Sequence, residues 1–190
     1  MLFGAFKHYP NAGFRASLYW KAFKDGHFSK VKASYTKNEV FSHGDGWLHV
    51  GRDNYTNKDR YLVNIDFHFS VFSYAGKYIY QISAVPDPNG PQHFQGYLLE
   101  KSFNGFLGLY RPPLLLDNDN PPYWHFPGLN PFDLSNADIF LNMKMWGGDG
   151  PHTGKGQVGC NDDDPNFSCL SIGGTKGTFE MHNFKLDRLQ

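Results

Sequence analysis

Asp66 and His68 stand two residues apart in a segment where apolar and polar residues alternate, and together they could carry acid–base chemistry. From Tyr61 to Phe72 the apolar residues fall on one side of this alternation and the polar residues on the other. A repeat of two is typical of a β-strand with one buried and one wet face. Side chains two positions apart on a strand are about 6–7 Å apart, so Asp66 could polarise His68 for proton transfer. A solvated outer face is the alternative interpretation.

The segment from Lys77 to Val85 alternates in the same way, and we expect it to pair with this strand as a hairpin. Placing apolar opposite apolar residues puts Val71 opposite Tyr78 and leaves residues 73–76 as a loop. The same register sets His68 beside Gln81 on the polar side. We therefore expect one polar surface made of Asn64, Asp66, His68, Ser70, Gln81 and Ser83, on which Asn64 and Gln81 would bind ligand hydroxyl groups.

Large aromatic side chains at expected strand ends or in loops give a second signal: Trp47, Tyr123, Trp124 and Trp146. The apolar face of a sugar ring stacks on such side chains, while carboxylates and amides bind its hydroxyl groups. The pattern indicates carbohydrate binding, as in a lectin or a carbohydrate-binding module. The alternative is that these rings only fill the ends of a β-sandwich.

Two acidic stretches could bind calcium, namely Asp117 to Asn120 and the run Asp162, Asp163 and Asp164. Calcium takes six to eight oxygen ligands, which neighbouring carboxylates, asparagine and backbone carbonyls can supply. Neither stretch has the ligand spacing of a helix-loop-helix calcium site. Apart from calcium, we expect no cofactor.

Cys160 and Cys169 bracket eight residues, and we predict that they close a small disulfide loop. Two unlinked thiols in a reducing compartment are the alternative. The triplets that begin at Asn54 and Asn166 fit the acceptor pattern for N-glycosylation. Together these features predict a glycoprotein that is secreted or held at the cell surface. The stretch from Met1 to Lys7 lacks the basic and apolar run of a signal peptide, so we expect such a segment to have been removed or never to have existed.

The composition predicts an all-β fold. The chain has 18 Phe and 11 Tyr against three Glu, which favours strands over helices, and 21 Gly with 12 Pro would interrupt short elements. Its 190 residues suit a single domain over 1–190. We expect a two-sheet antiparallel β-sandwich or jelly roll with long irregular loops. The last expected strand, Thr178 to Leu186, changes phase near Asn183, which predicts a β-bulge.

The charge balance excludes some partners. The formal net charge is zero and the pI is near 7.1, whereas a nucleic-acid-binding protein would have a basic excess. The longest apolar runs are far below the roughly 20 residues of a membrane-spanning helix. No feature of the sequence indicates an oligomeric state.

Two short segments resemble a known family. The run Phe14-Arg15-Ala16-Ser17 is similar to the arginine strand of enterotoxin-type ADP-ribosyltransferases, and Tyr78 to Ile82 is similar to one of their core strands. The resemblance covers under a tenth of the chain and implies a ribosyl-transferring toxin. The Ser-Thr-Ser strand and Glu-x-Glu loop of that family have no counterpart here, so a member would be degenerate.

Carbohydrate binding, through exposed tryptophans and the polar strand face, is therefore our main expectation, with a glycan or polysaccharide as partner. The main alternative is a polysaccharide lyase or hydrolase that uses His68 with Asp66 on the same face. A structural or adhesive surface protein and the degenerate ADP-ribosyltransferase are further alternatives.

Overall fold

A computed structural model describes residues 6–22, 28–36, 46–50, 60–88, 92–102, 104–111, 122–135, 139–148, 156–161, 168–174 and 177–187. The strands are β1 (Lys7–Ala22), β2 (Phe28–Lys30), β3 (Lys32–Thr36), β4 (Leu48–His49), β5 (Arg60–Tyr74), β6 (Lys77–Pro86), β7 (Leu98–Lys101), β8 (Leu107–Tyr110), β9 (Tyr123–His125), β10 (Phe140–Met143), β11 (Trp146–Gly148), β12 (Gly156–Asn161), β13 (Cys169–Ile172) and β14 (Gly177–Leu186). The helical element of these ranges is a short 3₁₀ turn, η1 (Gln92–Phe94). No helix among the described residues is long and apolar enough to cross a membrane.

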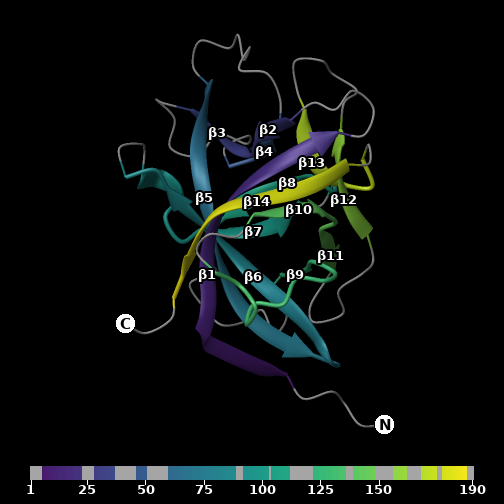
Figure 1. The fold of residues 1–190 in the computed structure, drawn as a ribbon. Coiled ribbons are helices and arrows are strands. Elements are labelled where there is room, and N and C mark those ends of the chain that lie inside the picture. The colour runs from purple at the N-terminus through teal and green to yellow at the C-terminus, as the bar shows by residue number, and fades with distance from the viewer. Residues whose placement is uncertain are drawn as a thin grey trace.

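Eight of the strands close into a barrel. From β5 the neighbours run through β3, β4, β13, β12, β11 and β9 to β6, and β6 pairs with β5 again, every pair being antiparallel. The prediction of an all-β fold is confirmed, but the strands form this ring in place of the two separate sheets that we expected. The cause is the length of β5, which pairs with β3 along residues 60–64 and with β6 along residues 65–74 and so joins the two sides (Figure 1).

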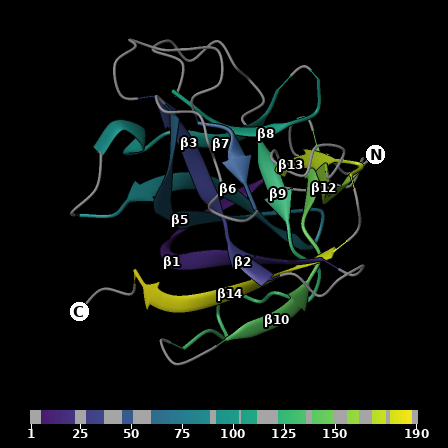
Figure 2. The ribbon, with the colours of Figure 1, turned by 90° about the horizontal axis from the view of Figure 1, so that it is seen from above.

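A further row of strands continues from β5 outside the ring. In this row β1 pairs with β5, β14 pairs with β1 and β10 pairs with β14. Seen from above, β6, β5, β1, β14 and β10 follow one another across the molecule (Figure 2). Because β2 also pairs with β1, the outward faces of β1, β2, β5 and β14 form one continuous surface.

Aromatic side chains fill the inward faces of these strands. Phe14 and Phe69 are completely buried and stack with their ring centroids 4.7 Å apart. The Tyr80 hydroxyl donates a hydrogen bond to the Leu129 carbonyl at 3.0 Å, which satisfies the one polar atom of that buried ring. Each such ring contributes about 1.5–3 kcal/mol on burial. The core therefore fixes the direction of the remaining side chains of β1 and β5, which point outward.

The hairpin of β5 and β6 differs in register from our expectation by two residues. Val71 pairs with Tyr80, and the turn consists of Ala75 and Gly76, both with positive φ (48° and 75°). Two residues in this conformation make the tight turn whose twist matches that of the flanking strands. A shift of two residues keeps every side chain on its face, so opposing apolar residues do not distinguish the two registers. On the polar side the neighbour of His68 is Ser83, and our expectation of Gln81 was wrong.

The predicted bulge in the last strand is confirmed. Arg15 pairs with Lys185 and Ser17 with His182, so β14 has one residue more than β1 between these two pairs. Asn183 adopts a positive φ of 59° at this point. The extra residue changes the phase of β14, because His182 and Asn183 both lie on the outward side while Phe184 is buried. If β14 alternated regularly through Asn183, Phe184 would face outward and Lys185 would face the core.

The predicted disulfide is wrong, because Cys160 and Cys169 are buried thiols that are not bonded to each other. Cys160 pairs with Leu170, and Cys169 with Asn161. Neighbouring residues of a strand point to opposite faces, so this register sends the two thiols to opposite sides of the sheet. The Sγ atom of Cys169 lies 3.6 Å from Nδ1 of His49. The intervening residues 162–167 are outside the described part of the chain.

Candidate functional site

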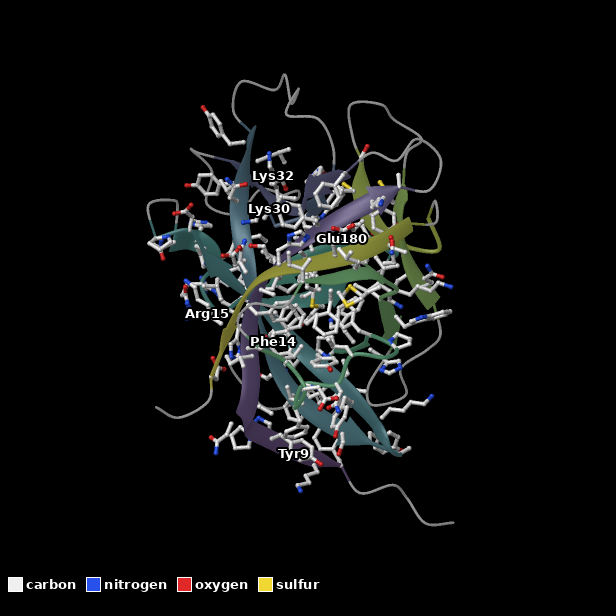
Figure 3. The ribbon with its side chains drawn as sticks, in the orientation of Figure 1. Tyr9, Phe14, Arg15, Lys30, Lys32 and Glu180 are labelled. Carbon is white, nitrogen blue, oxygen red and sulfur yellow. The ribbon has the colours of Figure 1, made fainter. Side chains whose placement is uncertain are left out.

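A polar groove of about 560 Å³ opens on the outward surface of β1, β5 and β14, and we call it the outer groove. The strand residues that line it are Arg15, Ser17, Lys30, Asp66, Val85, Pro86, Asn183 and Lys185, and Pro88, Gln92 and Gln95 from the segment after β6 complete the lining. The sequence of β1 explains why Arg15 and Ser17 belong to it, since the alternate residues Phe14, Ala16 and Leu18 are buried. Figure 3 shows Arg15 directed away from the interior into which Phe14 points (Figure 3).

Asp66 is fixed in the outer groove by two hydrogen bonds. Its Oδ1 atom accepts one from the Ser17 hydroxyl at 2.6 Å and one from the Lys30 ammonium at 2.8 Å. Burial by itself raises the pKa of the Asp66 carboxyl, but these hydrogen bonds and the charges of Lys30 and Lys185 together lower it below its ordinary value. Asn183 extends the network, because its Nδ2 atom donates to the Ser17 hydroxyl at 3.3 Å. Asp66 is therefore an ionised, oriented hydrogen-bond acceptor and not a proton donor at neutral pH.

His68 has a different carboxylate partner from the one we expected. Its Nε2 atom lies 2.5 Å from Oδ2 of Asp187, the residue that follows β14. Gly13 leaves the space for this pair, since a Cβ atom there would lie 2.5 Å from the same oxygen. Asp187, and not Asp66, is thus placed to orient the imidazole. The pairing of β14 with β1 brings Asp187 there, and this long-range contact has no signal in the local sequence.

The aromatic residues singled out from the sequence do not line the outer groove. Trp124 and Tyr123 are buried, with 2% and 6% of their surface exposed, so the expectation of exposed rings at these positions was wrong. The reason is that β9 lies between β6 and β11 in the barrel wall, where the indole N–H of Trp124 donates to the Leu99 carbonyl at 2.9 Å. Trp47 and Trp146 are half-buried, and Trp47 stacks on Phe106 with the centroids 5.4 Å apart.

An aromatic cluster that the sequence analysis missed lies next to the outer groove. Tyr19 and Phe28 stack nearly parallel with their centroids 5.0 Å apart, and His182 lies 4.7 Å from Tyr19. We call these three residues the aromatic platform. Tyr19 pairs with Lys30, and His182 with Ser17, so the platform adjoins the groove residues directly. Phe28 is 44% exposed. The sequence offered one signal for this cluster: Tyr19 lies two residues after Ser17 and four after Arg15, so its side chain faces the same side of the strand as theirs.

Asn64 and Gln81 lie on the polar side of their strands, as the alternation predicted. Asn64 is exposed opposite Lys32, and Gln81 is half-buried opposite Ser70. Both lie outside the outer groove, so their expected role in ligand binding stays a prediction. The His182 ring of the aromatic platform has a carboxylate partner. Its Nε2 atom lies 3.1 Å from Oε2 of Glu180, a residue that is nearly buried.

In the described ranges no three His, Cys, Asp or Glu side chains are grouped so that they could hold a metal ion. Asp162, Asp163 and Asp164 fall outside these ranges, as does the stretch from Asp117 to Asn120, so calcium binding there stays a prediction.

Comparisons of the chain with protein-family models, with curated proteins and with solved structures gave no match. The outer groove and the aromatic platform are therefore the features from which a function can be inferred.

Proposed function

We propose that this protein binds a carbohydrate in the outer groove and on the aromatic platform. The observation that carries the proposal is the stacked pair of Tyr19 and exposed Phe28 beside a polar groove of about 560 Å³. A sugar ring offers an apolar C–H face and a rim of hydroxyl groups, and this surface offers an aromatic face and a set of hydrogen-bonding side chains to match them. The volume lies within the range of small-molecule sites.

Preorganisation of the groove supports this function. Ser17, Asp66 and Asn183 are held by hydrogen bonds among themselves before any ligand arrives, so little side-chain freedom is lost on binding. Asp66 and Asn183 keep further donor or acceptor capacity, because a carboxylate has two oxygens and an amide has both an oxygen and two N–H groups. Gln92 and Gln95 add two further amides to the groove lining, and that of Gln92 is held by a hydrogen bond from its Nε2 atom to the Asp87 carbonyl at 2.8 Å.

Binding to a broad glycan array, followed by calorimetry with the best ligand, tests the proposal. Phe28→Ala should weaken binding roughly three- to tenfold, the equivalent of one lost ring contact. Phe132→Ala is the matched control, since Phe132 is 47% exposed and does not line the outer groove. Absence of binding to every glycan, or equal weakening by both variants, would refute the proposal.

An enzyme that cleaves a polysaccharide is the second candidate, favoured by the His68–Asp187 pair. A carboxylate that holds an imidazole in place prepares it to take a proton from a substrate. The test is release of unsaturated or reducing ends from a polysaccharide panel. Loss of this release in His68→Ala, with sugar binding retained, would support the enzyme, whereas no release by the unaltered protein would exclude it for that panel.

We also propose that the protein is secreted or held at the cell surface, because polysaccharides are abundant outside cells. Its support is the pair of glycosylation acceptors at Asn54 and Asn166, both outside the described residues. A mass shift on enzymatic removal of N-linked glycans from protein made in its native host tests it. An unchanged mass would leave this location without support.

A further inference from the structure

We propose that the outer groove selects an acidic sugar, with a carboxylate or sulfate group bound between Arg15 and Lys185. This inference rests on the proposed carbohydrate-binding function and names the class of sugar.

The outer groove has a surplus of positive charge. Its lining includes the cations Arg15, Lys30 and Lys185 and one carboxylate, Asp66, so three positive charges less one negative charge leave two. Lys30 forms an ion pair with Asp66 at 2.8 Å and balances it. The surplus therefore belongs to Arg15 and Lys185. It is local, because the whole chain has a formal net charge of zero.

Arg15 and Lys185 are direct neighbours across the β1–β14 pairing, and both are exposed. Directly opposite residues of antiparallel strands have Cβ atoms about 4.5–5.5 Å apart, and like charges at this spacing repel each other. An anion placed between the two side chains removes that repulsion and gains two charge-assisted hydrogen-bonding partners. The planar guanidinium of Arg15 can bind a carboxylate or sulfate through two parallel N–H groups.

Two titratable groups adjoin this pair in the strand register, one from β5 and one from the end of β14. His68 pairs with Arg15 across β1 and β5, and Asp187 follows Lys185 by two residues. The Asp187 carboxylate is directed to Nε2 of His68 at 2.5 Å. Asp187 does not line the outer groove, and its carboxylate contacts the imidazole, so Arg15 and Lys185 stay available to a ligand.

The groove also has the features that distinguish a sugar from a simple anion. Asn183, Gln92 and Gln95 supply uncharged donors and acceptors for hydroxyl groups around the cation pair. Arg15 and Tyr19 are four residues apart on β1, which corresponds to about 13 Å. An oligosaccharide with an acidic unit at Arg15 and a following unit on the aromatic platform would use both parts of the surface.

The test measures binding of the full chain to polygalacturonate, alginate and hyaluronate, each paired with its carboxyl-reduced form. Heparin is paired with a form that is desulfated, N-acetylated and carboxyl-reduced, so that every paired form is uncharged. We expect at least one acidic polymer to bind at least tenfold more tightly than its uncharged form. The double variant Arg15→Gln/Lys185→Gln should lose at least tenfold for that polymer, and the ratio of its affinities for the acidic and the uncharged form should fall to near one. Lys77→Gln is the control, because Lys77 is exposed at the hairpin turn and outside the outer groove. Circular dichroism should show that the variants keep the fold.

The failures of the two proposals are distinguishable. Equal binding of acidic and uncharged forms, or acid-selective binding unchanged in the double variant, would overturn this inference and leave the proposed function standing. Equal binding of polyglutamate would show an unspecific polyanion surface and would overturn the inference as well. Absence of binding to any polymer or array glycan would refute both.

Discussion

The bulge at Asn183 offers the sharpest test of how the fold builds the outer groove. Asn183 holds a positive φ of 59°, and its side chain donates to Ser17 across the strand pairing. Asn tolerates this left-handed conformation better than most residues, Gly adopts it freely and Ala does not. Replacing Asn183 by Ala and by Gly therefore separates the contribution of the backbone from that of the side chain.

The expected magnitudes follow from these two contributions. Asn183→Ala loses a long hydrogen bond made by an exposed side chain, about 0.5 kcal/mol, and adds about 1–2 kcal/mol of backbone strain. Asn183→Gly loses the same hydrogen bond, and it also gives the unfolded chain more conformational freedom. The two effects together cost about 1–1.5 kcal/mol, without backbone strain. We therefore expect the Gly variant to be more stable than the Ala variant by about 1 kcal/mol. With a urea dependence of roughly 2–3 kcal/mol/M, the midpoints would differ by about 0.4 M.

Urea unfolding followed by tryptophan fluorescence measures this difference, since Trp20 and Trp124 are buried and report on the core. The unaltered protein should be the most stable of the three, the Gly variant intermediate and the Ala variant the least stable. An Ala variant as stable as the Gly variant, or more stable, would refute the reasoning. It would mean that the backbone at position 183 does not require a left-handed conformation.

Three further outcomes are expected. Phe14→Ala should lower the free energy of unfolding by about 3–5 kcal/mol, because the ring is completely buried and stacks on Phe69; a loss below about 1 kcal/mol in chemical denaturation would contradict this. Asp66 has a lowered pKa in the folded state, so its contribution to stability is present above about pH 4 and is lost as the pH falls through the folded value. Asp66→Asn should therefore show a shallower acid decline of Tm between pH 7 and pH 2, and parallel curves would count against the ion pair. Protein denatured without reductant should react with two equivalents of a thiol reagent, one each at Cys160 and Cys169, whereas no reaction would indicate a disulfide after all.

Alternation was enough to predict the long strands and their faces. In β5 the residues Ile65, Phe67, Phe69 and Val71 are buried, as the repeat of two indicated, and the phase change at Asn183 correctly located a bulge. These features depend on residues next to each other in the chain, and steric alternation acts at that range. The two-residue error in the hairpin register has the same origin, because alternation is unchanged by a shift of two.

The members of the groove could not be predicted, because alternation does not say which strand lies beside which. Ser17 and Asp66 are 49 residues apart, His68 and Asp187 are 119 apart, and Asn183 and Ser17 are 166 apart. Only the order β5, β1, β14 brings them together. Trp124 was misplaced for another reason, since β9 has three residues and so short a strand contains no repeat from which a buried face can be read.

The pairing of β1 with β14 also bears on how the protein is made. During synthesis β1, which ends at Ala22, leaves the ribosome well before β14, which begins at Gly177. This part of the sheet is therefore incomplete until β14 has been synthesised and has paired with β1. Until then the β14-facing edge of β1 has unsatisfied backbone groups, which invite pairing with another molecule. A fragment that stops before β14 would keep Arg15, Lys30 and Asp66, yet it would tend to self-associate through that edge instead of recognising a ligand.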